Sequence, residues 1–161
     1  MELKDAIKRS MQTEKYAMDF YRLAAARMSK SSARSVFELL AREEREHAAS
    51  FYKIYPGNDI PDFEAFLNSQ SGHEASWYAS LEKSLESGFT EQKALAFALD
   101  KEKALEESLR RLASGINQPE IRAVFEMNAE ETHRHYLLIE ADYARMMRMV
   151  HESEMDTYVR E

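Results

Sequence analysis

Apolar residues recur every three or four positions along four long stretches of the chain, which is the spacing of one face of an α-helix. This pattern predicts helices at about residues 3–28, 33–55, 91–114 and 119–150. The polar run Ser29–Ser32 separates the first two helices, and Gly115 is placed to end the third. Thr90 is the expected N-cap of the third helix, and Pro119 suits the first turn of the fourth. The pattern therefore predicts two helical hairpins.

A connection of 34 residues, about 56–89, links the two hairpins. It opens with the turn-rich run Pro56–Pro61, and a one-sided apolar pattern predicts a short helix at about Glu74–Glu86. The connection is too long for a simple loop but long enough to travel the length of a bundle. We therefore expect the second hairpin to start at the same end as the first. The predicted fold is all-α, an antiparallel four-helix bundle over residues 1–150 with one long crossover, followed by a polar tail at 151–161.

Composition supports helices and excludes several classes of function. Four glycines and three prolines in 161 residues favour helix over sheet, and the length suits one domain. A net charge of −7 argues against a nucleic-acid partner. The absence of cysteine excludes disulfides, iron–sulfur clusters and cysteine-ligated zinc or iron modules. No signal peptide and no membrane span are found, so we expect a cytoplasmic protein with no membrane partner.

Each predicted helix carries an ionisable residue within its apolar stripe. In the third helix the stripe consists of Leu95, Ala98, Glu102, Leu105, Leu109 and Leu112, with the glutamate as its only charge. Glu14 holds the same kind of position in the first helix. The second and fourth helices each carry a Glu-x-x-His quartet, Glu44–His47 and Glu130–His133. Three residues separate neighbouring ridges one turn apart, so each quartet can offer an oxygen and a nitrogen to one metal ion.

Hairpin geometry brings each lone glutamate level with a quartet. Glu14 precedes Glu44 by 30 residues and Glu102 precedes Glu130 by 28, and both midpoints fall at predicted turns. Four carboxylates converging in one core would repel each other, whereas two divalent ions would neutralise them. Oxygen and imidazole ligands suit iron or manganese. The sequence therefore predicts a two-metal site in the bundle core.

These residues resemble ferritin-like di-iron proteins of the rubrerythrin type. The resemblance spans about residues 5–145 and rests on Glu14 with Ala17 and Phe20–Tyr21, on Glu44–Ala48 and on Ala129–His133. It implies two iron ions, with manganese or zinc as substitutes, and the ligands Glu14, Glu44, His47, Glu102, Glu130 and His133. By the same resemblance Glu14 and Glu102 are terminal or bridging ligands. Glu44 and Glu130 bridge or chelate, and each histidine caps one iron.

The chain departs from the rubrerythrin pattern in two places. Rubrerythrins usually carry a second glutamate three residues after the first in the third helix, and this chain has Leu105 there, with Glu106 one residue further on. They also carry a C-terminal rubredoxin domain, which a chain without cysteine cannot form. The resemblance therefore implies an external electron donor or none.

Two other helix faces compete with the predicted one. Glu43 with His47, and Glu131 with His135, have i,i+4 spacing and would present a different face to the core. A further alternative is that both quartets are solvated surface residues. Because glutamate is common in this chain, the quartets alone do not decide among these assignments.

The function predicted from this pattern is an oxidoreductase whose Fe(II) ions react with O₂ or hydrogen peroxide, in peroxide or oxygen detoxification or in ferrous oxidation. One alternative is iron storage or delivery with the metal pair as a ferroxidase centre, and another is a metal-free helical scaffold with a decayed site. A homodimer or higher homo-oligomer is expected from the aromatic residues of the crossover. These residues, which would otherwise cover the side of their own bundle, are Phe63, Phe66, Trp77 and Tyr78.

Overall fold

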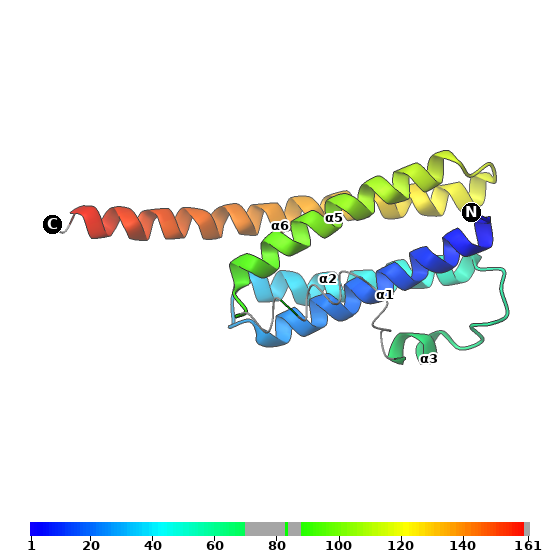
Figure 1. The fold of residues 1–161 in the computed structure, drawn as a ribbon, viewed down its shortest axis with the longest axis horizontal. Helices are drawn as coiled ribbons and strands as arrows, with labels where there is room; N and C mark the ends of the chain where they lie inside the picture. Colours follow the sequence, from blue (N-terminus) through cyan, green and yellow to red (C-terminus); the bar gives the residue numbers. More distant parts are fainter. Residues whose placement is uncertain (70–82, 84–87, 160–161) are drawn as a thin grey trace.

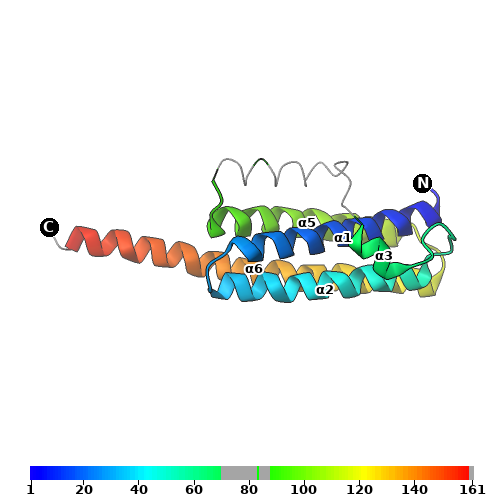
Figure 2. The same ribbon diagram turned by 90° about the horizontal axis from the view of Figure 1, so that it is seen from below.

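The fold is an antiparallel bundle of four long helices (Figures 1 and 2). The computed structural model describes residues 1–69, 83 and 88–159, with side chains up to residue 149. The long helices are α1 Leu3–Arg27, α2 Ser32–Ile54, α5 Glu91–Ser114 and α6 Pro119–Val159, and a short helix, α3 Phe63–Asn68, follows α2. The described residues contain no strand. The prediction of an all-α bundle with one long connection is confirmed.

The helix ends follow local capping chemistry. The side chain of Ser31 accepts a hydrogen bond from the backbone N–H of Arg34 at the start of α2, and Thr90 accepts one from Lys93 at the start of α5. Gly115 ends α5, with its N–H donating to the carbonyl of Leu112. The predicted bounds of the first three long helices are correct to within one residue.

Helix α6 is longer than predicted. The sequence places its end near Val150, but the helix continues to Val159 and projects beyond the other three (Figures 1 and 2). The polar segment after Val150 contains neither glycine nor proline, so nothing in its local sequence interrupts the helix. The predicted end of the fourth helix near Val150 is therefore wrong.

Two apolar clusters fill the two ends of the bundle. One end contains Tyr21, Phe37, Leu95 and Ile139, and the other contains Ile7, Phe51, Leu109 and Phe125. The start of α5 thus lies beside the end of α1, so the expectation that both hairpins start at the same end is wrong (Figure 1). The reason is geometric. Helix α2 returns the chain to the end where it began, whereas α5 starts at the opposite end.

Helix α3 covers the side of its own bundle. Phe63 and Phe66 pack against a cluster that includes Met18 and Ala48. The predicted short helix at Glu74–Glu86 lies outside the described residues except for residue 83, and Trp77 and Tyr78 lie outside them too. None of the described helices has an apolar stretch sufficient to cross a membrane.

Candidate metal centre

A layer of ionisable side chains lies between the two apolar clusters of the bundle. Its almost fully buried members are Glu14 from α1, Glu44 and His47 from α2, Glu102 from α5 and His135 from α6. Charged side chains are seldom buried to this extent unless they are paired or bind a metal. Since all four long helices contribute, the bundle itself fixes the geometry of the layer.

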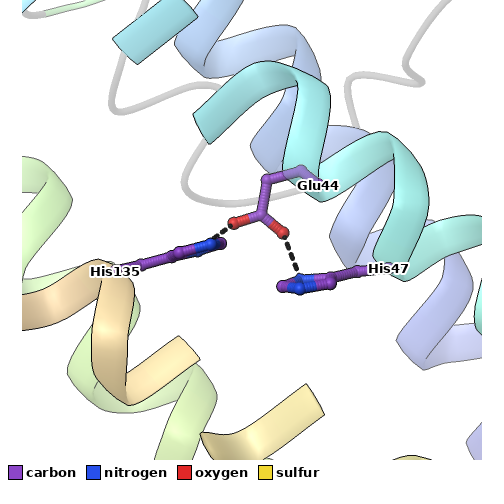
Figure 3. Close-up of side chains that lie close together, drawn as sticks. All are labelled: Glu44, His47 and His135. Atoms are coloured by element: carbon purple, nitrogen blue, oxygen red, sulfur yellow. Dashed lines mark hydrogen bonds and ion pairs between the residues drawn. The ribbon is translucent and has the colours of Figure 1, made fainter. Parts of the chain in front are cut away.

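The carboxylate of Glu44 lies between the two histidines (Figure 3). The Nδ1 atom of His47 is 3.1 Å from Glu44 Oε2, and the Nδ1 atom of His135 is 3.0 Å from Glu44 Oε1. The two imidazole rings are stacked, with centroids 5.1 Å apart and an interplanar angle of 16°. Both Nδ1 atoms therefore face the same carboxylate from opposite helices.

Each histidine also lies near a second buried glutamate. Glu14 Oε2 is 3.8 Å from the Nδ1 of His47, and Glu102 Oε1 is 3.8 Å from the Nδ1 of His135. The layer thus consists of two similar halves that share Glu44. Each half brings together one imidazole nitrogen, one carboxylate of its own and one oxygen of the shared carboxylate.

The outer nitrogens of the histidines contact two half-exposed carboxylates. The Nε2 of His47 lies 2.5 Å from Glu131 Oε2 of α6, and the Nε2 of His135 lies 2.6 Å from Glu43 Oε2 of α2. The contacts run crosswise between α2 and α6. They border a cleft of about 500 Å³ that is lined by Glu43, Glu46, Glu131, Arg134, His135 and Leu138. Both carboxylates therefore connect the buried layer with solvent.

Protons and neighbouring charges balance the layer when no metal is bound. Burial lowers the pKa of both histidines, but the surrounding carboxylates outweigh it and raise the pKa to about 12 for His47 and about 11 for His135. With a carboxylate at each ring nitrogen, both histidines are suited to be doubly protonated cations. Burial raises the pKa of Glu44, but the neighbouring Glu14, His135 and His47 together bring it well below its usual range.

The pKa values of the two outer buried glutamates, Glu14 and Glu102, shift in the opposite direction, upward. Burial, followed by the negative charge of Glu44, raises the pKa of Glu14 well above its usual range. The same two causes raise the pKa of Glu102 to about 6. The layer without metal therefore stores protons on Glu14 and on both histidines at neutral pH.

Tyr21 supports Glu102 from within the apolar core. Its hydroxyl donates a short hydrogen bond to Glu102 Oε1, and its ring packs edge-on against Phe37 with centroids 5.0 Å apart. Burial and the charge of Glu102 raise the pKa of Tyr21 well above its usual range, so the phenol stays protonated. It therefore acts as a fixed donor that orients one glutamate.

Three carboxylate oxygens in the layer have no hydrogen-bond partner among the described residues. They are both oxygens of Glu14 and Oε2 of Glu102. An unpaired buried polar atom costs free energy, and such atoms are rare in native proteins. Metal ions would satisfy these oxygens, and the combination of carboxylate oxygen with imidazole nitrogen is one that iron, manganese and zinc accept. The residues present therefore fit a pair of divalent metal ions.

The structure brings together four of the six predicted ligands and not the other two. Glu14, Glu44, His47 and Glu102 lie in the buried layer. Glu130 is exposed, and the side chain of His133 is 48% exposed and contacts Glu106 instead. The helix face predicted for Glu130 and His133 is therefore wrong.

The competing face of α6 points into the core. Its buried residues include Phe125, Thr132, His135 and Ile139, whereas Leu137 on the predicted face is 49% exposed. Both faces have three- and four-residue spacing, so periodicity alone does not separate them. The i,i+4 pair Glu131–His135, one of the alternatives left open by the sequence, supplies the carboxylate and imidazole that reach the layer.

Glu106 does not replace the carboxylate that is missing at Leu105. Its Oε2 lies 3.0 Å from the Nδ1 of His133, and its Oε1 accepts hydrogen bonds from Arg110 outside the buried layer. These contacts, with His133 first, lower the pKa of Glu106, against the effect of its partial burial. Leu105 thus leaves one side of Glu102 without a neighbouring acid from α5.

The bundle and the layer of buried glutamates and histidines define a ferritin-like protein with a carboxylate–histidine site. A family model described as Rubrerythrin matches residues 5–143, which is most of the chain. The chain therefore belongs to the rubrerythrin family, whose members bind di-iron centres. Comparisons with curated proteins and with solved structures gave no match.

Proposed function

We propose that the protein is an oxidoreductase in which two iron ions react with O₂ or hydrogen peroxide. The observation that carries this proposal is the shared position of Glu44 between two imidazole Nδ1 atoms, each with a further buried glutamate beside it. We propose as ligands Glu14, Glu44, His47, Glu102 and His135, with Glu131 as the carboxylate that contacts the outer nitrogen of His47. On α6, His135 thus replaces the predicted His133, and Glu131 reaches the layer in place of the predicted Glu130.

Bound iron would supply the one-electron chemistry needed to reduce O₂ or peroxide. The chain's own residues would bind the ions, orient the ligand side chains and shield the site. Glu14 with His47, and Glu102 with His135, would hold one ion each, and Glu44 would contact both. The apolar clusters at the two ends of the bundle shield the layer from water along the bundle axis. Electrons would come from an external donor, because this chain has no cysteine to form a rubredoxin-type module.

Proton release accompanies metal binding in this proposal. The protons on His47, His135 and Glu14 must leave before their nitrogens and oxygens can bind a cation. Glu131 and Glu43 contact the histidines and border the cleft toward solvent, so they offer a path for these protons. Tyr21 keeps its proton and holds Glu102 in place.

The test is oxidant consumption by protein that has been loaded with Fe(II) under anaerobic conditions. We expect wild type to consume peroxide or O₂ in proportion to its bound iron, with an absorbance change in the near ultraviolet. Glu44→Ala should lose both, while Glu46→Ala, which changes an exposed glutamate two residues away, should keep both. Oxidant consumption that is the same in wild type and Glu44→Ala would refute the proposal.

Iron storage or delivery is a second candidate, favoured by the acidic lining of the cleft between α2 and α6. Glu43, Glu46 and Glu131 give this cleft an excess of negative charge beside the buried histidines, and negative charge attracts cations. Storage requires a closed shell of many copies. Native mass measurement separates the two candidates, since a shell has many times the mass of a monomer or dimer.

A further inference from the structure

A second cavity reaches the ionisable layer from the opposite side of the bundle. Figure 2 shows α1 and α5 in one layer and α2 and α6 in the other. The cavity lies between α1 and α5, has a volume of about 610 Å³, and includes Tyr21 and Glu102 in its lining. This volume falls within the range of roughly 300–1,000 Å³ that is usual for small-molecule sites.

The wall of this cavity is apolar where the rubrerythrin pattern would be acidic. Leu105, Leu109 and Leu112 form a continuous ridge along α5, and Ala17 and Phe20 face them from α1. Leu105 stands three residues after Glu102, at the position where rubrerythrins usually have a second glutamate. From Glu102 to Leu112 the ridge extends about 15 Å, at 1.5 Å per residue of helix. The cavity is therefore elongated and suited to an extended hydrocarbon chain.

The rim of the cavity is positively charged in a protein whose net charge is −7. Arg9, Lys101 and Arg111 all contribute to its lining. Among the described residues none of the three forms an ion pair, although the Lys101 ammonium lies 5.2 Å from the centroid of the Phe97 ring. Arg9 and Arg111 lie at the end that is remote from Glu102. Two unpaired guanidinium groups at one end of an apolar cavity favour a carboxylate.

We propose that this cavity binds a long-chain carboxylate. The carboxylate would lie at Arg9 and Arg111, and the chain would follow the leucine ridge toward Tyr21 and Glu102. Binding rests on the cavity alone, whereas a role for this ligand as substrate or effector of the metal centre rests on the proposed function. A second copy of the chain is a poorer occupant, because an isologous contact over this face would bring two positively charged rims together.

The experiment is a calorimetric titration of the full-length chain with dodecanoate, whose extended chain is comparable in length to the ridge. Wild type should bind one equivalent. The double variant Arg9→Glu/Arg111→Glu, and Leu112→Trp, which fills the cavity, should each bind at least tenfold more weakly. Leu137→Trp, on the exposed face of α6, is the matched control and should bind like wild type. Dodecyltrimethylammonium, with the same chain and the opposite charge, should bind at least tenfold more weakly than dodecanoate.

Absence of dodecanoate binding in wild type, or equal binding of both amphiphiles, would overturn the proposal. So would a dimer that Leu112→Trp dissociates without any dodecanoate binding in wild type, since the face would then be a subunit interface. Bound iron is measured on the same samples. Dodecanoate binding without bound iron would refute the proposed function and leave the cavity assignment intact, and iron without dodecanoate binding would do the reverse.

Discussion

Glu43 contacts the outer nitrogen of His135, and this contact determines which nitrogen of the ring faces Glu44. Its Oε2 lies 2.6 Å from His135 Nε2, so the proton stays on Nε2 and Nδ1 is left to bind a metal. Metal-bound histidines commonly depend on such a partner for their orientation. Glu43 is thus a positioning residue, even though it is half-exposed and is not itself a proposed ligand.

Replacing Glu43 with alanine should weaken the half of the site that contains His135. We expect roughly a 10- to 100-fold loss of affinity for one of two divalent ions, the usual effect of removing such a partner. Anaerobic Fe(II) calorimetry measures the affinity, and nitrogen NMR of the imidazole reports the tautomer of His135. Glu46→Ala is the control, since that side chain is 74% exposed. Equal affinities in the two variants would show that Glu43 has no positioning role.

At the level of single residues, the sequence predicts the site where one helix face is unambiguous. Glu102 is the only charge on the apolar stripe of α5, and Glu44 with His47 lies between Leu40 and Phe51, so the burial of these proposed ligands follows from periodicity. Helix α6 offers two amphipathic faces with the same spacing. The buried one is decided by packing of Phe125 and Ile139 against the other helices. That packing is a property of the assembled bundle, and local sequence does not encode it.

The helices as elements are predicted well because their ends depend on local chemistry. Ser31, Thr90 and Gly115 each act within four residues of the backbone groups that they satisfy. The end of α6 lacks such a signal, which is why its extension to Val159 is not predicted. The end of a helix is harder to predict from sequence when no capping residue marks it.

Removal of residues 151–161 should leave the bundle and its site intact. This segment belongs to the part of α6 that projects past the other helices (Figures 1 and 2), whereas Tyr143 and Met146 still pack on the core. We expect the melting temperature to change by no more than a few degrees and the bound iron to be unchanged, because the projecting end of a helix usually contributes little stability. Thermal unfolding followed by circular dichroism measures this, and a large drop would mean that the projection is part of the folded core or of an interface.

For the whole molecule, the direction of the crossover and the cavity between α1 and α5 lie beyond prediction from the sequence. Both depend on how the two hairpins are placed against each other, and no local motif records that placement. Composition and length do predict the single helical bundle and exclude cysteine chemistry. The buried ionisable residues are visible in the sequence, but their protonation depends on the complete assembly of the four helices.

The stability of the metal-free protein should fall as the pH rises above neutral. The pKa values of His47 and His135 are raised to about 12 and about 11, above the usual value near 6.5 in an unfolded chain. A raised pKa contributes stability that is complete below pH 6.5 and is lost as the pH rises through about 11 to 12. The raised pKa of Glu102, about 6, acts in the same direction between about pH 4.5 and 6.

Bound metal should reverse this trend, because it replaces the protons on the histidines and is favoured at higher pH. Melting temperatures between pH 6 and 9, with and without Mn(II), measure both slopes. His135→Ala should flatten the slope of the metal-free protein, whereas His133→Ala, at an exposed position, should not. A melting temperature of the metal-free protein that rises or stays constant over this range would contradict the charge balance described for the layer.

The central claim is that α6 contributes Glu131 and His135, and not their neighbours, to a two-metal centre. Iron bound per chain after anaerobic Fe(II) loading and desalting tests it in two matched pairs, Glu131→Ala against Glu130→Ala and His135→Ala against His133→Ala. We predict two irons in wild type, Glu130→Ala and His133→Ala, and clear losses in Glu131→Ala and His135→Ala. Loss of iron in Glu130→Ala and His133→Ala instead, or equal iron in all variants, would contradict this assignment of the α6 residues.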